Sequence, residues 1–362
     1  MIQSVENISL ALRSLYRSCG YMRYKMSKFE EYDFYVRNKD FLVSDSVITF
    51  TDTTGKLMAL KPDVTLSIVK NTRDVPGCVQ KVYYNENVYR VSGSARSFRE
   101  IVQLGLECIG DIDDYSIFEV LSLAAKSLQT ISEDSVLSIS HLGLLSDILC
   151  DLPQEKRASI LSLIRDKNAH ELEKACTDAS IDDRYRLLSA LIECSGSPAQ
   201  VLPRLEALLG KTPAVCQLKR LTSAFEGTAL ARILRIDLSV INDINYYNGI
   251  VFKGFVEGVP QSVLSGGQYD LLMQKMQRRS GAIGFAVYTD LLERLHPSSR
   301  EYDADTVLLY DANADVKDVA AAVSALQKDG RRVIAQRSVP DKLRYRQLMR
   351  IEKGEVKIVE NA

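Results

Sequence analysis

The chain has 362 residues, of which 46% are hydrophobic and 26% charged, so it is long enough for one large core and at least one smaller unit. Its 46 basic and 47 acidic residues give a formal net charge of -1, which argues against a global positive field that would attract nucleic acid or an anionic membrane. The seven cysteines are scattered and form no CxxC pair, which disfavours a disulfide framework or a zinc site and fits a reducing cytosol.

Residues 1–18 predict an amphipathic helix. The segment has no uninterrupted apolar run, so it is typical of neither a signal peptide nor a membrane anchor. The apolar side of the helix is predicted to consist of Ile8, Leu10, Leu12, Leu15 and Tyr16.

Strands follow this helix. Residues 47–50 and 57–60 flank a TDTTGK turn and predict a hairpin. Pro62 then ends the second strand, and residues 65–71 can turn helical. Two longer segments, KVYYNENVYRV and REIVQLGLECIG, are joined by a small flexible loop and predict an antiparallel pair.

Beyond Asp114 the leucine spacing predicts mainly helix, which we interpret as a helical insertion at about residues 133–230. Strand character returns at 233–241 and 249–256, and a helix at 269–278 and a Gly-rich run follow. One sheet interrupted by helices is therefore expected.

The last part of the chain predicts a separate β-α-β unit. A linker at 297–299 precedes a strand at DTVLLYD, a helix at 315–328 and a strand at RRVIAQ. A solvated helix face is the expected position of the basic residues here, which are Arg331, Arg332, Arg337, Lys342, Arg344, Arg346, Arg350 and Lys353.

The segment 101–109 carries the sharpest chemical pattern. Period-two geometry places Gln103, Gly105 and Glu107 on one face of the strand, with apolar residues on the other. Gly105 would leave room for a ligand between an amide and a carboxylate. A sheet face that is polar only because it meets water explains the same pattern.

Two further segments offer polar groups. In LKPDVT, Asp63 and Thr65 could hold an ammonium group, or they could form only a turn or a helix cap. In YYNGIVF, Tyr246 and Tyr247 offer hydroxyls, or they could be half-buried core aromatics.

In this order, the segments over residues 1–296 resemble histidyl-tRNA synthetase, a class II synthetase. GYMRYKMSKFEEYDFY resembles the entry to motif 1, with Ser27 in place of the usual proline, and LKPDVT resembles the loop that binds the α-amino group. YRVSGSARSFREIVQLGLECIG resembles motif 2 and its following strand. INDINYYNGIVF, SGGQYDLL and GAIGFAVYTDLLERL resemble later family segments, the last of them motif 3.

This resemblance implies an α+β fold, a class II aminoacyl-tRNA synthetase-like antiparallel sheet flanked by helices. The synthetase-like core would span residues 1–296 and contain the helical insertion. Residues 301–362 would form a short α/β unit, a truncated anticodon-binding-like domain.

The resemblance also implies an amino-acid pocket. It places Asp63 and Thr65 on the substrate ammonium, Gln103 near the carboxyl end, and Glu107 with two tyrosines around the imidazole. The residues implied for histidine binding are Asp63, Thr65, Arg90, Gln103, Glu107, Tyr246 and Tyr247.

The adenylation machinery of the family is not matched. Asn242 stands at the position of the arginine that stabilises charge at the α-phosphate, and Leu291 at that of the motif 3 arginine. Ser92 replaces the motif 2 glutamate, and Gln268 replaces the arginine of GGRYD. Arg294 could serve in motif 3 only if the helix shifted by three residues.

A kept pocket without adenylation arginines resembles the regulatory subunit of short-form ATP phosphoribosyltransferase, which is not itself an enzyme. That family implies a hetero-oligomer with the short catalytic subunit, control of the first step of histidine biosynthesis, and feedback inhibition by L-histidine. It also implies a dimer through the synthetase-like core, a cytoplasmic location, no cofactor, and no membrane or tRNA partner. Histidine would bind in the pocket or at a subunit interface.

Two alternatives stay open from the sequence. One is a divergent but active histidyl-tRNA synthetase. The other is a stand-alone paralogue that binds an amino acid or RNA without a phosphoribosyltransferase partner.

Overall fold

The computed structural model describes residues 5–39, 42, 47–91, 97–241, 246–292, 302–352 and 355–361. The chain divides into two compact units, Met1–Leu295 and His296–Ala362. Each unit has its own sheet and its own buried apolar side chains, and each is described by itself.

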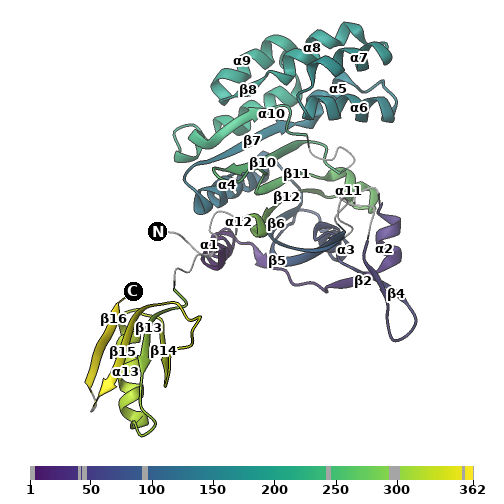
Figure 1. The fold of residues 1–362 in the computed structure, drawn as a ribbon. Coiled ribbons are helices and arrows are strands. Elements are labelled where there is room, and N and C mark those ends of the chain that lie inside the picture. Colours follow the sequence, from purple (N-terminus) through teal and green to yellow (C-terminus); the bar gives the residue numbers. More distant parts are fainter. Residues whose placement is uncertain are drawn as a thin grey trace. The chain divides into compact units, whose positions relative to one another are not determined.

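A sheet of nine described strands forms the centre of the larger unit, in the order β1-β5-β6-β12-β11-β10-β7-β9-β8 (Figure 1). The pairs from β5 to β7 are antiparallel, whereas β1 runs parallel to β5 and β9 parallel to β7. The strands are β1 (Met22–Arg23), β5 (Val79–Val91), β6 (Phe98–Gly110), β7 (Ser135–His141), β8 (Ser195–Gly196), β9 (Leu234–Asp237), β10 (Ile250–Val256), β11 (Leu264–Gln268) and β12 (Gly281–Tyr288).

The β5–β6 hairpin confirms the predicted antiparallel pair. Its register places Tyr84 opposite Gly105 and Glu86 opposite Gln103. The remaining face of β6 packs into the main apolar core through Leu104 and other apolar residues, as its alternation predicted. Each polar residue of the pattern therefore faces away from that core.

Helices α1 (Val5–Ser18) and α4 (Asp114–Ile131) cover the apolar side of the sheet. Tyr16 of α1 is fully buried, and its hydroxyl lies 2.9 Å from the Ser127 hydroxyl of α4. Ile8 and Leu12 are buried as predicted, but Leu10 is 55% exposed, so its place on the apolar side of the helix was wrong. Each helical residue is rotated by about 100° from the one before it, so Leu10 points away from the side on which Ile8 and Leu12 meet the sheet.

Strand β7 corrects the expected start of the helical insertion. The leucine spacing predicted a helical region here, whereas Ser135–His141 pairs with β10 and β9 inside the main sheet. The alternation of Leu137 and Ile139 with serines carries the period-two signal that the leucine-rich surroundings obscured.

Helices dominate the region after β7, as predicted. They gather at one end of the larger unit (Figure 1, teal) and share its core. They are α5 (Leu142–Ile148), α6 (Gln154–Arg165), α7 (Ala169–Asp178), α8 (Asp182–Ile192), α9 (Pro198–Leu209) and α10 (Pro213–Ser223), followed by the 3-10 helix η2 (Ala229–Ile233).

A separate three-stranded sheet precedes the long hairpin. Its order is β2 (Phe29–Glu31), β4 (Leu57–Leu60), β3 (Thr49–Thr51), all antiparallel, and the β3–β4 pair confirms the predicted hairpin. The remaining short helices of the unit are α2 (Tyr32–Arg37), α3 (Thr65–Asn71), α11 (Asp270–Lys275) and α12 (Thr289–Leu292). Helix α3 confirms the predicted helical turn after Pro62.

The smaller unit contains the predicted β-α-β element, β13 (Ala304–Leu309), α13 (Val316–Lys328) and β14 (Val333–Gln336), with parallel strands. The sheet continues through β15 (Tyr345–Glu352), parallel to β13, and the antiparallel β16 (Glu355–Asn361). The expected helix face for the basic residues was therefore wrong, because Arg346 and Arg350 lie on a strand. Arg332 and Arg344 pair with the aspartates at 305 and 303, so part of the basic charge is matched locally.

Among the described residues, no helix combines the length and apolar character needed to span a membrane.

Replacing Leu12 with alanine should lower the free energy of unfolding by about 2–5 kcal/mol, because it opens a cavity between α1 and the sheet. The matched variant Leu10→Ala removes the same atoms from a half-exposed position and should change stability by no more than about 0.5 kcal/mol. Urea unfolding of both variants checks this, and equal losses would refute the orientation of α1.

Candidate functional site

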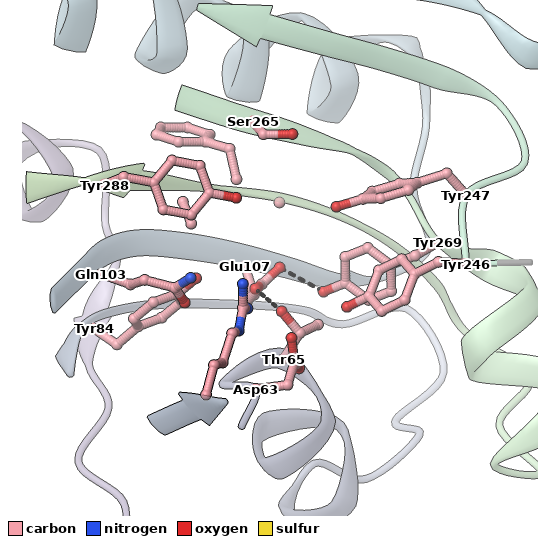
Figure 2. Close-up of a pocket in the computed structure, with 14 residues that line it drawn as sticks. Asp63, Thr65, Tyr84, Gln103, Glu107, Tyr246, Tyr247, Ser265, Tyr269 and Tyr288 are labelled. Carbon is pink, nitrogen blue, oxygen red and sulfur yellow. Dashed lines mark hydrogen bonds between the residues drawn. The ribbon is translucent and has the colours of Figure 1, made fainter. Parts of the chain in front are cut away.

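A cavity of about 90 Å³ lies on the face of the main sheet opposite α4 (Figure 2). It is roomy enough for several water molecules or a small organic group. All seven residues implied as a site by the sequence line it, although they come from four segments. The lining residues that the sequence analysis missed are Tyr84, Ser265, Tyr269, Gly284, Phe285, Ala286 and Tyr288. We call this cavity the Glu107 pocket.

Glu107 is buried and engaged in hydrogen bonds within the pocket. It is 2% exposed, and each carboxylate oxygen accepts a hydrogen bond. The Thr65 hydroxyl donates to Oε1 at 2.7 Å and the Tyr269 hydroxyl to Oε2 at 2.7 Å (Figure 2). The Glu107 carboxylate thereby links strand β6 to the start of α3 and to the residue before α11.

Gly284 of β12 makes room for that carboxylate. A Cβ atom at this position would lie 1.7 Å from Glu107 Oε2 and 2.5 Å from the Leu106 carbonyl oxygen. Since no side chain fits in that space, the register of β12 against β6 requires glycine opposite Glu107.

The space beside Gly105 is not free for a ligand, contrary to the expectation from the sequence. A Cβ there would lie 2.5 Å from the Tyr84 hydroxyl oxygen and 2.3 Å from the Phe285 carbonyl oxygen. The alternation correctly predicted the face of the strand. It could not reveal that the cross-strand neighbour, Tyr84, folds over the glycine.

Asp63 accepts a backbone hydrogen bond and also lines the cavity. One carboxylate oxygen accepts the Leu66 N–H at 2.9 Å in the first turn of α3, as a capping residue does. The residue also lines the pocket. The helix-cap interpretation and the binding interpretation of LKPDVT are therefore compatible.

Burial dominates the electrostatics of both carboxyl groups. It raises the pKa of Glu107 to about 8, although the hydrogen bonds from Tyr269 and Thr65 lower it, and nearby Asp63 raises it further. Burial also raises the pKa of Asp63, against the Leu66 N–H and the Arg90 guanidinium. A ligand that brings a positive charge or N–H donors would favour the ionised form of both groups.

Tyrosines form the wall at the other end of the pocket. The rings of Tyr246 and Tyr247 lie 4.6 Å apart, and those of Tyr246 and Tyr269 lie 5.7 Å apart, measured between centroids. Burial raises the pKa of the Tyr246 and Tyr269 hydroxyls well above the ordinary value. These hydroxyls therefore stay neutral and can donate or accept hydrogen bonds.

Gln268 and Leu291, two of the positions interpreted as lost arginines, have local structural contacts. The Gln268 side-chain oxygen accepts the Ile250 N–H at 2.8 Å, at the start of β10. Leu291 in α12 packs against the main apolar core. Asn242, Ser92 and Arg294 lie outside the described residues.

No cluster of three or more metal-ligating side chains occurs in the part of the chain that the structure describes.

Comparison with known proteins gives a consistent set of relatives. The family model described as Histidyl-tRNA synthetase matches residues 2–292. A curated relative from Oceanobacillus iheyensis, named ATP phosphoribosyltransferase regulatory subunit, is 27% identical over 342 residues, covering 91% of this chain and 84% of the relative.

Solved structures share the fold. An ATP phosphoribosyltransferase regulatory subunit/histidyl-tRNA synthetase from Bacillus halodurans superposes with a TM-score of 0.78 at 23% identity, covering 96% of this chain and 93% of that chain. A chain of the ATP phosphoribosyl transferase (HisG:HisZ) complex from Thermotoga maritima gives 0.61 at 23% identity, covering 80% and 98%. The predicted class II synthetase-like fold and the predicted resemblance are confirmed. The binding roles of the pocket residues stay predictions.

The raised pKa of Glu107 predicts a pH-dependent stability. Since the folded chain keeps a proton up to about pH 8 and the unfolded chain loses it near the ordinary value of 4.5, the free energy of unfolding falls as the pH rises between these values. This single group contributes a slope of up to about 1.4 kcal/mol per pH unit. Below the window the destabilisation is absent, and above it the destabilisation is complete.

Glu107→Gln cannot titrate and should lack that contribution. Urea unfolding of both proteins at several pH values across the window isolates it, because titrating groups that do not interact with Glu107 cancel in the difference. A difference between the two proteins that does not change with pH would contradict the assignment.

Proposed function

Because the chain belongs to the histidyl-tRNA synthetase family, we propose that it is a non-catalytic member of that family, a regulatory subunit of short-form ATP phosphoribosyltransferase. In this role it assembles with the short catalytic subunit and takes part in the feedback control of the first step of histidine biosynthesis. Support comes from the curated relatives of that name, which match over most of the chain, and from the complex in which a chain of similar fold was solved.

The observation that carries the proposal is that the residues implied for histidine binding meet at one cavity. The seven pocket residues converge on one cavity. Of the positions where the resemblance places adenylation arginines, Gln268 and Leu291 instead make structural contacts. Adenylation requires cations around the triphosphate, and neither side chain supplies one.

The pocket suits L-histidine chemically. Each Glu107 oxygen accepts one hydroxyl and keeps a further lone pair, so the carboxylate can also accept an imidazole N–H. Asp63 and Thr65 suit the ammonium group, and Gln103 with Arg90 suits the carboxylate. An isostere without the N–H would leave a lone pair of the buried carboxylate without a donor, which is the basis of selectivity.

Regulation then follows from linkage. A ligand shifts an assembly only if it binds two states with different affinity. If L-histidine binds the chain more tightly in the inhibited state of the hetero-oligomer, occupancy of the Glu107 pocket biases the catalytic subunit toward that state. A dimer formed through the synthetase-like core would couple two such pockets.

Co-expression with a short-form catalytic subunit tests the proposal. We expect one complex on size exclusion, phosphoribosyltransferase activity that depends on this chain, and inhibition of the complex by L-histidine. Pyrophosphate exchange by the purified chain with histidine and ATP would instead establish an active synthetase. Histidine or RNA binding without complex formation would establish a stand-alone binding protein.

Glu107→Gln should raise the L-histidine concentration needed for half-inhibition by about tenfold or more, because a charged acceptor of the imidazole N–H is lost. Its control is Glu100→Gln on the same strand, whose carboxylate accepts the Tyr89 hydroxyl at 3.0 Å in an exposed position. The control should be inhibited like the wild type. Unchanged inhibition in Glu107→Gln would remove Glu107 from the effector site.

A further inference from the structure

We propose that Lys61 and Glu86, which do not line the Glu107 pocket, are positioning residues whose buried ion pair holds the carboxyl group of Asp63 in place for a ligand's ammonium group. The inference rests on the proposed function, since it assumes an amino-acid ligand in this pocket. Nothing in the sequence pattern singled out either residue.

The ion pair is largely buried. Lys61 Nζ lies 3.0 Å from Glu86 Oε2, and the two side chains are 2% and 14% exposed. A lysine ammonium loses most of its hydration in such a position, which disfavours its charged form. Burial accordingly lowers the pKa of Lys61, and the Glu86 carboxylate opposes that shift.

Three contacts from strand β5 hold the loop that carries Asp63. Glu86 binds the Lys61 side chain, the Tyr89 N–H donates to the Lys61 carbonyl oxygen at 2.9 Å, and the Arg90 Nε–H donates to the Pro62 carbonyl oxygen at 3.2 Å. From the other side, the Lys61 N–H donates to the Lys28 carbonyl oxygen at 2.9 Å. The two residues before Asp63 are therefore held through both backbone and side chains.

Charge alternates along this contact. Glu86 faces Lys61, and Lys61 and Arg90 are the two cations that favour the ionised form of Asp63. Burial works in the opposite direction at Asp63, so the loss of one cation would shift that carboxyl toward its neutral form. A neutral carboxyl attracts an ammonium group far less than a carboxylate does.

Two ligands that differ only in the ammonium group can distinguish an effect of Lys61 on Asp63 from a purely structural effect on the pocket. L-Histidine carries an α-ammonium group, and imidazolepropionate keeps the imidazole and the carboxylate but lacks it. Calorimetric titration of the full chain with each ligand gives the ratio of their affinities. A general loosening of the pocket would weaken both ligands together, whereas the loss of an ionised Asp63 weakens only L-histidine.

In Lys61→Met we expect L-histidine to bind about tenfold more weakly, because a neutral carboxyl holds an ammonium group less tightly than a carboxylate does, with imidazolepropionate unchanged within about twofold. The double variant Lys61→Met/Glu86→Gln should show the same loss of discrimination. Because it leaves no unpaired buried charge, it should fold even if the single variant does not.

Lys81→Met is the matched control. Lys81 lies on the same strand as Glu86 and pairs with Glu119 of α4 at 2.7 Å, away from the Glu107 pocket. This variant loses a partly buried ion pair of the same type and should keep the wild-type affinity ratio.

The outcomes separate the two proposals. A wild-type chain that binds neither ligand would overturn the histidine-binding function, and the role of Lys61 with it. If the wild type discriminates between the ligands, an unchanged ratio in the Lys61→Met and double variants would overturn the positioning role alone. Equal weakening of both ligands would do the same.

Discussion

The burial of one carboxylate, that of Glu107, ties together distant segments of the larger unit. Its two oxygens accept hydroxyls from Thr65 and Tyr269, and its side chain lies against Gly284. Thr65 and Tyr269 lie 42 and 162 residues from Glu107 along the chain. A buried acceptor without partners is costly, so the start of α3, strand β12 and the loop before α11 must all reach the correct register for this face to form.

That requirement explains why a polar cavity persists inside an otherwise apolar sheet. Burial raises the pKa of the Asp63 and Glu107 carboxyl groups, and tyrosine rings form one wall of the cavity that these groups line. Such an arrangement stores unfavourable electrostatic free energy, which a cationic or N–H-donating ligand can relieve. A site of this kind suits a binding protein, because the relief of that energy on binding contributes to affinity and selectivity.

A regulatory role places different demands on the fold from those of catalysis. Adenylation needs cations positioned on a triphosphate, whereas sensing needs only a pocket whose occupancy differs between two assembly states. Gln268 and Leu291, two positions where the resemblance places arginines of the adenylation site, make structural contacts. One orients the start of β10, and the other fills part of the core. The fold can therefore remain while the chemistry changes.

Much of this protein was readable from its sequence, because the decisive information was local. Period-two alternation placed Gln103 and Glu107 away from the apolar core, and the turn and proline signals located the β3–β4 hairpin and α3. The resemblance named all seven of the predicted residues that line the cavity. Two of the errors were also local: β7 was assigned to a helical region because leucine spacing outweighed a short alternating run, and the basic C-terminal segment was assigned to a helix instead of a strand.

Tertiary structure alone decided which groups meet. No spacing along the chain relates Tyr84 to Gly105, Tyr269 to Glu107 or Lys61 to Glu86, since each contact depends on strand register and on how a loop packs across the sheet. The same holds for the titration of the pocket, because a pKa responds to burial and to neighbouring charges, which exist only in the folded chain. The sequence by itself determined the fold class and the chemical types present at the site, while folding determined their distances, their charge states and the supports that hold them.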